Sequence, residues 1–201
     1  MNAVEIQGLT KRYGAITAVD SLDLAVRQGE LFALLGVNGA GKTTTIKMLS
    51  CLTRPDGGDA RLLGRSIVSD AAGVKRCIGV SPQETAVAPN LTARENLALL
   101  CGVHGLSRQE TAARTEELSR ALGLDVLARA ELWDVVRQLK GRITVILTTH
   151  YLEEAEALSD RVGIMKDGRL LALGTPEELK RQAGCDRFED AFIAMVREAG
   201  R

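Results

Sequence analysis

Apolar and polar residues alternate near the start of the chain and then give way to an uninterrupted apolar run. The alternation over residues 4–6 and 22–26 predicts short antiparallel strands, joined through residues 11–14. Residues 31–35 are apolar throughout, which is typical of a strand that is buried on both faces. The pattern therefore predicts a small antiparallel β subdomain ahead of a buried parallel strand.

Predicted helices and strands alternate after that strand. Residues 42–52 carry a helical pattern, residues 55–58 (Pro-Asp-Gly-Gly) predict a turn, and residues 77–80 predict another strand. This order is typical of an α/β fold in which helices connect the strands of a parallel sheet. We expect an α/β domain with a parallel core and an N-terminal antiparallel β subdomain.

Three further helices are predicted before the next strand. Residues 92–95 (Thr-Ala-Arg-Glu) and 107–110 (Ser-Arg-Gln-Glu) have the capping-box pattern, which satisfies free N–H groups at a helix start. The third helix is expected over about residues 126–140, with Asp125 as its cap and Gly141 at its end. Two of the three helix starts are therefore well marked.

A strand and a hairpin follow these helices. Residues 143–148 predict the strand, because all six are apolar or β-branched. Asp167-Gly168 is the two-residue signal for a tight turn between strands over residues 162–166 and 169–173. We expect an antiparallel hairpin there.

The length of 201 residues suits a single domain over residues 1–201 with a small helical appendage. The appendage is expected over about residues 175–201. Thr175 caps a helix that runs to about residue 182, and residues 188–197 form a last amphipathic helix.

Charge and hydropathy exclude several classes of function. Lys and Arg number 26, as do Asp and Glu, so the net charge is zero and no basic stripe is available for a nucleic-acid backbone. Apolar runs reach only about five residues, against about 20 for a membrane span, and no secretory signal opens the chain. We expect a cytosolic protein that does not bind nucleic acid. The cysteines form no C-x-x-C pair, which favours reduced thiols over a disulfide or a zinc site; they are Cys51, Cys77, Cys101 and Cys185.

The junction between the buried strand and the following helix carries the clearest chemistry. Residues 36–43 satisfy the spacing G-x-x-x-x-G-K-[ST], whose glycines let backbone N–H groups converge on phosphate oxygens. Lys42 would reach the β and γ phosphates, the Thr43 hydroxyl would bind Mg²⁺, and the helix N-terminus adds positive potential. A chance glycine-rich turn is the alternative. The predicted nucleoside triphosphate site consists of Gly36, Asn38, Gly39, Ala40, Gly41, Lys42, Thr43 and Thr44.

Three residues outside this loop occur in an order that the loop alone does not predict. They are Tyr13 in Lys-Arg-Tyr-Gly, Gln83 in Ser-Pro-Gln-Glu, and His150 after the apolar run. Together with the loop, and with the residues that follow His150, they resemble the ATP-binding subunit of an ABC transporter. The resemblance covers nearly all of the chain and looks most like the cytoplasmic ATPase of a bacterial ABC-2 type exporter.

The resemblance implies a role for each of these residues. Tyr13 would stack on adenine, Gln83 would contact Mg²⁺ or water and face the membrane partner, and His150 would bind the γ-phosphate and position water. Each also has a structural interpretation, as a strand-end packing residue, an ordinary strand exit and a hydrogen-bonded structural histidine, respectively. His104 has no comparable context and is expected at the surface.

The family implies ligands and partners as well. The ligands are ATP and Mg²⁺, and the partner is a separate transmembrane permease that holds the subunit at the inner face of the cell membrane. Members of the family act as a dimer of ATP-binding subunits. The transported substrate and the direction of transport depend mostly on the permease.

The sequence departs from the family in its middle. A phosphate-loop ATPase needs a strand that ends in an acidic residue to hold Mg²⁺, and in ABC proteins a glutamate follows to orient the attacking water. No run of four apolar residues is followed by Asp-Glu here, and the Leu-Ser-Gly-Gly-Gln signature is also absent. Residues 107–122 resemble the helix before the signature, and residues 123–129 resemble the loop after the acidic strand. We infer that several dozen residues of the family pattern are missing between Leu122 and Gly123.

This gap affects both stability and catalysis. The missing strand is interior in the family, so the remaining sheet must rejoin across the gap or expose an apolar edge. The signature loop comes from a second subunit, so dimerisation is in doubt together with hydrolysis. Three hypotheses follow: an ATPase subunit that powers export through a separate membrane protein, a module that binds nucleotide without turnover, and a non-functional deletion product.

Overall fold

A computed structural model of the chain describes residues 1–80, 91–121, 139–149 and 151–198. By their packing the residues divide into two units, one made of residues 1–79 and 137–201 and the other of residues 80–136. No helix of the described residues is long and apolar enough to span a membrane.

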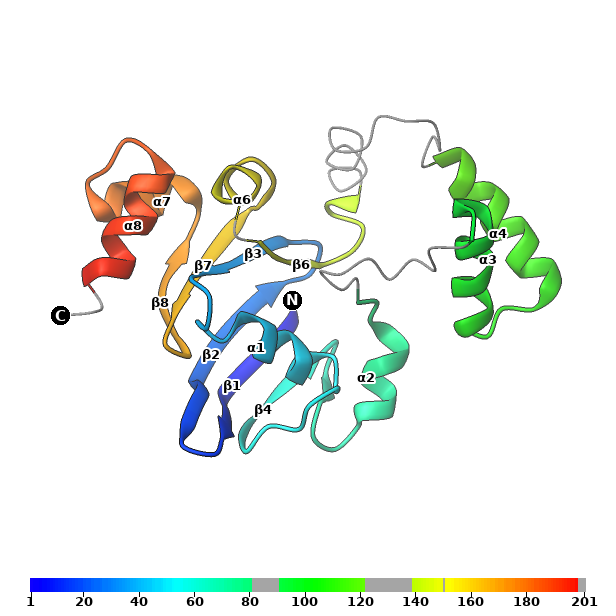
Figure 1. Ribbon diagram of the computed structural model, residues 1–201, viewed down its shortest axis with the longest axis horizontal. Coiled ribbons are helices and arrows are strands. Elements are labelled where there is room, and N and C mark those ends of the chain that lie inside the picture. Colours follow the sequence, from blue (N-terminus) through cyan, green and yellow to red (C-terminus); the bar gives the residue numbers. More distant parts are fainter. Residues whose placement is uncertain (81–90, 122–138, 150, 199–201) are drawn as a thin grey trace. The chain divides into compact units, whose positions relative to one another are not determined.

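The first unit contains an antiparallel sheet in the order β2-β1-β4-β5 (Figure 1). This sheet confirms the predicted N-terminal β subdomain. Its first two strands are longer than predicted because a bulge at Gly8, with φ of 57°, shifts the register between Ile6 and Leu9 and so interrupts the alternation. The strands are β1 (Asn2–Tyr13), β2 (Ile16–Arg27), β4 (Gly57–Leu62) and β5 (Arg65–Ser66).

A second sheet in the same unit has the order β6-β3-β7-β8. Strand β3 is central and runs parallel to β6 and β7, and β8 pairs antiparallel with β7. The predicted parallel core and the predicted hairpin are both confirmed. No described strand pairs with the second edge of β6. The strands are β3 (Leu31–Gly36), β6 (Val145–Thr148), β7 (Arg161–Lys166) and β8 (Arg169–Gly174).

Strand β3 separates two hydrophobic cores. Because successive side chains of a strand point to opposite faces, Phe32 and Leu34 pack into the core that β1, β2 and the first helix share. Ala33 and Leu35 pack into the core beneath the later helices. A central strand buried on both faces explains the unbroken apolar run in the sequence. The helices of this unit are α1 (Lys42–Leu49), α2 (Ala71–Cys77), α6 (Leu152–Leu158), α7 (Pro176–Ala183) and α8 (Phe188–Glu198).

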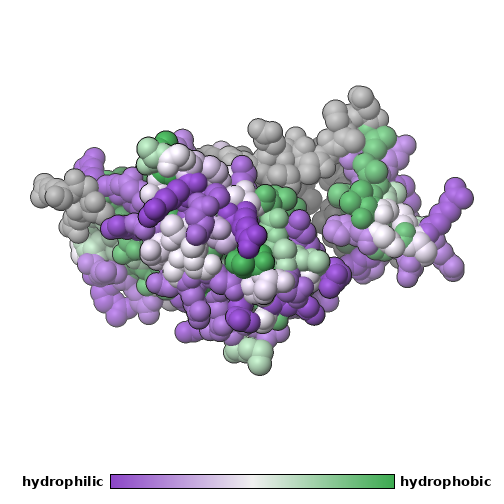
Figure 2. All heavy atoms as spheres, turned by 90° about the horizontal axis from the view of Figure 1, so that it is seen from below, coloured by the Kyte–Doolittle hydropathy of each residue, from purple (hydrophilic) through white to green (hydrophobic). Residues whose placement is uncertain are grey.

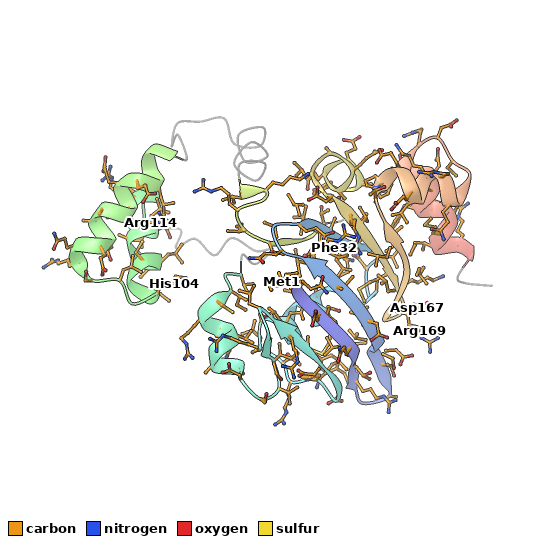
Figure 3. All side chains as sticks on the ribbon, turned by 180° about the vertical axis from the view of Figure 1, so that it is seen from behind. Met1, Phe32, His104, Arg114, Asp167 and Arg169 are labelled. Atoms are coloured by element: carbon orange, nitrogen blue, oxygen red, sulfur yellow. The ribbon has the colours of Figure 1, made fainter. Side chains whose placement is uncertain are left out.

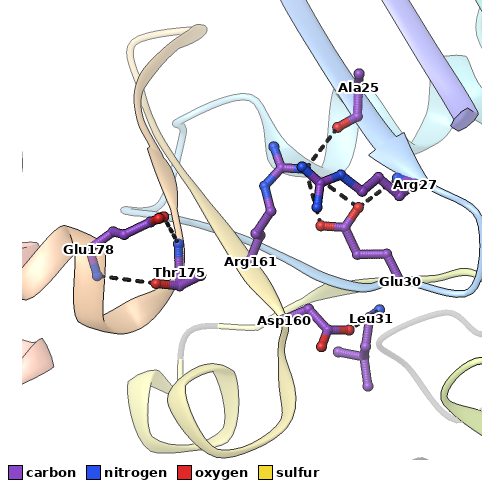
Figure 4. Close-up of polar contacts among 8 residues, drawn as sticks. All are labelled: Ala25, Arg27, Glu30, Leu31, Asp160, Arg161, Thr175 and Glu178. Atoms are coloured by element: carbon purple, nitrogen blue, oxygen red, sulfur yellow. Dashed lines mark hydrogen bonds and ion pairs between the residues drawn. The ribbon is translucent and has the colours of Figure 1, made fainter.

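Helix α7 begins as its sequence predicts. The Thr175 N–H donates to Glu178 at 2.8 Å, and the Glu178 N–H donates to the Thr175 hydroxyl at 3.1 Å, which completes a capping box (Figure 4). Pro176 occupies the first turn, where its missing N–H costs nothing. Gly184 ends the helix in the left-handed conformation.

Polar contacts at the other end of β3 join the two sheets. Glu30 is nearly buried, and its carboxylate accepts from Arg161 Nη1 at 3.1 Å and from the Arg27 N–H (Figure 4). The Arg161 guanidinium also lies 5.9 Å from the centre of the Phe32 ring. The Asp160 carboxylate accepts from the Leu31 N–H at 3.0 Å. These contacts fix where β3 enters the sheet.

The second unit contains a helical hairpin of α3 (Ala93–Val103) and α4 (Arg108–Ala121). Both predicted capping boxes are present: Thr92 exchanges hydrogen bonds with Glu95, and Ser107 does so with Glu110. Leu99, Leu100 and Val103 of α3 are exposed. Figure 2 shows hydrophobic side chains at the surface of this unit. His104 caps the C-terminus of α3 and is exposed, as expected (Figure 3).

Some predicted elements differ in the structure. The strand expected over residues 77–80 is wrong: Cys77 ends α2, and residues 78–80 belong to no element. Helix α1 ends at Leu49 rather than at residue 52, because Cys51 has a φ of 55° that a helix cannot continue. The predicted turn at residues 55–58 is shorter, since its glycines already belong to β4. Most of the helix expected over residues 126–140 lies outside the described residues.

Candidate nucleotide-binding site

The predicted phosphate-binding loop connects the carboxyl end of β3 to the start of α1. Strand β3 ends at Gly36 and α1 begins at Lys42, so the loop lies at the edge of the parallel sheet where such folds place their ligands. Ala40 is 1% exposed, whereas Asn38 and Gly39 are exposed. The loop is therefore anchored at its end and open to solvent at its rim.

The backbone at Gly41 admits no side chain. Its φ is 102°, and a Cβ atom there would lie 2.4 Å from the Ala18 carbonyl oxygen. This close approach holds the loop against the first residues of β2. Thr45, which is fully buried in α1, reinforces the junction because its hydroxyl donates to the Gly41 carbonyl at 3.0 Å.

Free donors converge at the start of α1. Among the described residues, none accepts a hydrogen bond from the N–H groups of Gly41, Lys42, Thr43 and Thr44. The first N–H groups of a helix have no partner within the helix, and the helix dipole adds positive potential at the same place. These four N–H groups are therefore suited to bind an anion with several oxygens.

The Lys42 side chain folds over the loop itself. Its ammonium donates to the carbonyls of Gly36 at 2.6 Å and of Val37 at 3.1 Å. Burial lowers the pKa of Lys42 below its usual value. No described carboxylate pairs with this ammonium, so its charge is available to a phosphate. The Thr43 hydroxyl, which is exposed, also has no partner among the described residues.

Tyr13 lies on the same hairpin that touches the loop. It pairs with Ile16 at the tip of the β1–β2 hairpin, and Ala18, two residues further along, contacts Gly41. Tyr13 is 48% exposed, so it is not buried in the β subdomain, and the Lys11 ammonium lies 5.5 Å from the centre of its ring. An exposed aromatic face is therefore present near the phosphate-binding loop.

Two predicted site residues, Gln83 and His150, lie outside the described residues. The strand before His150 is placed, however. Thr148 aligns with Leu34 in the parallel pairing of β6 and β3, so the chain leaves β6 at the same edge as the loop. Thr149 is nearly buried there, and its hydroxyl accepts from the Tyr151 N–H at 3.0 Å.

Within the described residues, no group of three or more His, Cys, Asp and Glu side chains is arranged to hold a metal ion. Strand β6, next to β3, ends at Thr148 and is followed by Thr149 rather than by an acidic residue. Among the described residues, the Thr43 hydroxyl is the predicted Mg²⁺ ligand that the structure places at the loop.

Sequence reasoning missed the support behind the loop. The Gly168 N–H, in the turn between β7 and β8, donates to the Ala40 carbonyl at 3.1 Å. The sequence identified Asp167-Gly168 only as a tight turn, since a contact across more than a hundred residues leaves no local pattern. The closeness of Ala18 to Gly41 was also missed, because these two residues belong to different elements and their contact leaves no local pattern either.

Residues 19–168 match the family model described as ABC transporter. The chain belongs to the ABC transporter family. The match contains the whole phosphate-binding loop and ends within the β7–β8 turn. The family predicted from the motifs is thus confirmed.

Curated relatives cover nearly the whole chain. The daunorubicin resistance ATP-binding protein of Streptomyces coeruleorubidus is 36% identical over 241 residues, which includes 99% of this chain and 75% of that protein. The doxorubicin resistance ATP-binding protein of Mycobacterium tuberculosis is 38% identical, with 96% and 70% covered. The Nod factor export ATP-binding protein I of Burkholderia orbicola is 35% identical, with 92% and 75% covered.

Solved structures agree with this assignment. A structure titled as the ATP-binding subunit of an ABC transporter has a TM-score of 0.83 and 25% identity, with 96% of this chain and 99% of that chain covered. A dimeric ATP-binding cassette bound to ADP and phosphate has a TM-score of 0.74 at 19% identity, with 86% and 98% covered, which shows the fold. The α/β fold class is confirmed.

Proposed function

We propose that this chain is the ATP-binding subunit of an ABC-type exporter and that it holds MgATP on the loop from Gly36 to Thr44. The observation that carries the proposal is the set of N–H groups at the start of α1 that no described residue accepts from, beside an ammonium that no described carboxylate pairs with. Family membership and the names of the relatives support the exporter class.

In this proposal the phosphates displace the internal contacts of Lys42. The ammonium leaves the carbonyls of Gly36 and Val37 and pairs with the β and γ phosphates, which are stronger acceptors because they are charged. The Thr43 hydroxyl contributes to Mg²⁺, and Tyr13 offers its exposed ring to adenine. Gln83 and His150 keep the roles that the family implies, toward Mg²⁺ and the γ-phosphate.

Thermal unfolding of the purified chain with and without MgATP tests this binding. Saturating ligand at 100 times its Kd stabilises a protein by about 2.7 kcal/mol, so millimolar MgATP is expected to raise the melting temperature by several degrees. Lys42→Ala should remove the shift. Lys47→Ala, an exposed lysine on the same helix, should keep it and serves as the matched control. An unchanged melting temperature with MgATP in the wild-type chain would contradict the proposal.

The proposal includes a separate transmembrane permease as partner and a place at the inner face of the cell membrane. Membership of the family and the relatives named as resistance and export proteins support it. Fractionation of the native cells tests it: the chain should sediment with membranes and be released by detergent. Recovery of the chain in the supernatant before detergent would argue against a membrane partner.

A further inference from the structure

The turn between β7 and β8 joins the phosphate-binding loop to β2 through a single residue. The Gly168 N–H donates to the Ala40 carbonyl at 3.1 Å, and the Gly168 carbonyl accepts from the Asp20 N–H at 2.9 Å. Both peptide groups of the turn residue are thus used in contacts between elements that lie far apart in the sequence.

The three segments pack backbone against backbone. A Cβ atom on Gly168 would lie 3.0 Å from the Ala18 carbonyl oxygen, and one on Gly41 would lie 3.4 Å from the Gly168 Cα. Gly168 also has a φ of 78°, a conformation that disfavours other residues. A side chain at Gly41 would overlap β2, and one at Gly168 would crowd it, so the turn, the loop and β2 are closely packed.

The hydrogen bond to Ala40 bears on the direction of the phosphate-binding donors. The Ala40 carbonyl and the Gly41 N–H belong to one planar trans peptide, so they point in opposite directions. Because the carbonyl is held by Gly168 behind the loop, the Gly41 N–H points to the opposite side, where it has no acceptor among the described residues. The contact with Gly168 therefore presents this donor to a ligand.

An ion pair ties the turn to β2. Arg169 follows Gly168, and its Nε and Nη2 atoms lie 2.8 Å and 2.6 Å from Asp20 Oδ2. Asp20 is the residue whose N–H also bonds the Gly168 carbonyl. Figure 3 shows Arg169 and Asp167 on this hairpin end, beside β2. Hydrogen bonding to Arg169 holds the pKa of Asp20 below its usual value, so the pair stays charged near neutral pH.

We propose that Arg169 and Asp20 are positioning residues for ATP binding, which act through Gly168 to hold the Ala40–Gly41 peptide in its phosphate-binding orientation. The inference rests on the proposed ATP-binding function. Loss of the ion pair would leave the fold intact, since Arg169 is largely exposed, but would let the turn and the loop move together.

Nucleotide titration of variants tests the inference. Arg169→Met is expected to weaken ATP binding about two- to fivefold, the range that corresponds to an exposed ion pair, with little change in the melting temperature of the nucleotide-free chain. Arg169→Lys should retain part of the affinity. Arg187→Met removes an equally exposed arginine, paired with Glu189, and should change neither quantity.

Two further measurements separate positioning from a structural role. The charge-swapped double variant Asp20→Arg with Arg169→Asp should regain affinity relative to either single variant, and exchange of the Gly168 amide hydrogen should be faster in Arg169→Met. An Arg169→Met chain that binds ATP as tightly as the wild type would overturn the inference. Failure of the wild type to bind ATP would instead overturn the proposed function.

Discussion

At the scale of single residues, the phosphate-binding loop depends on space around its backbone. Gly39 and Gly41 both have a positive φ, but only Gly41 lies against another backbone segment. We expect Gly39→Ala to cost about 1 kcal/mol of stability, from its conformation alone. Gly41→Ala should abolish ATP binding, because its Cβ would overlap the Ala18 carbonyl. Thermal unfolding and titration with a fluorescent ATP analogue measure both effects. Equal losses of ATP affinity in the two variants would refute the importance of the Ala18 contact.

Glu30 offers a second test at this scale. Glu30→Gln keeps the shape of the side chain but leaves the Arg161 guanidinium, with 18% of its side chain exposed, without a counter-charge. Breaking a buried ion pair lowers the free energy of unfolding by about 3–5 kcal/mol. Because the Glu30–Arg161 pair is partly exposed, we expect a loss of about 2–3 kcal/mol. Urea unfolding measures the change. Glu177→Gln, in an exposed pair with Lys180, is the control and should cost less than about 0.5 kcal/mol. Similar losses for the two variants would refute the argument.

At the scale of elements, the edge of β6 that no described strand covers has a predictable consequence. The Val145 N–H donates to the Glu30 carbonyl, so the peptide groups of Val145 and Leu147 point toward β3. The peptide groups of Ile146 and Thr148 therefore point to the other side of β6. No described strand pairs with that side. The edge carries neither charge nor proline to prevent pairing with another chain.

We therefore expect the purified chain to self-associate as its concentration rises. Thr148→Pro removes an outward N–H without loss of a bond to β3, so it should reduce this association, whereas Thr148→Ala should not. Sedimentation velocity over a range of concentrations measures the effect, and circular dichroism checks that the variants are folded. A wild-type chain that stays monomeric at high concentration would show that the edge is protected.

The elements that the sequence predicted correctly are those that leave a local pattern. Strand β3, the β7–β8 hairpin and α7 were predicted close to their observed bounds, because burial on both faces, a two-residue turn and a capping box each leave a local pattern. The prediction of a strand over residues 77–80 was wrong, although its residues suit a strand. A strand needs a hydrogen-bonding neighbour, and none is placed beside these residues in the described sheets.

The residues of the candidate site likewise divide into those that the sequence predicted and those that it did not. The loop residues were predicted because their spacing follows from the needs of a phosphate. Gly168 and Ala18, which support the loop from behind, were not predicted, since contacts between distant segments are set by the fold. The roles of Gln83 and His150 stay predictions, because both residues lie outside the described part of the chain.

At the scale of the whole molecule, length separates this chain from its relatives. The alignment with the Streptomyces coeruleorubidus protein runs over 241 positions, about 40 more than the 201 residues of this chain, so that relative contains residues without a counterpart here. We infer that the difference includes the acidic strand and the signature loop, between Leu122 and Gly123. The pattern of four apolar residues and Asp-Glu is absent from the whole sequence.

This absence predicts slow turnover. A residue that orients or activates the attacking water contributes about 10²–10⁴-fold to a rate, so the chain should hydrolyse MgATP at least about 100-fold more slowly than the Streptomyces coeruleorubidus relative. Phosphate release under saturating MgATP measures both rates. Insertion of the relative's corresponding segment between Leu122 and Gly123 should raise the rate, and Lys42→Ala should abolish the gain. Turnover in the unaltered chain that equals the relative's and is lost in Lys42→Ala would mean that another carboxylate serves the site.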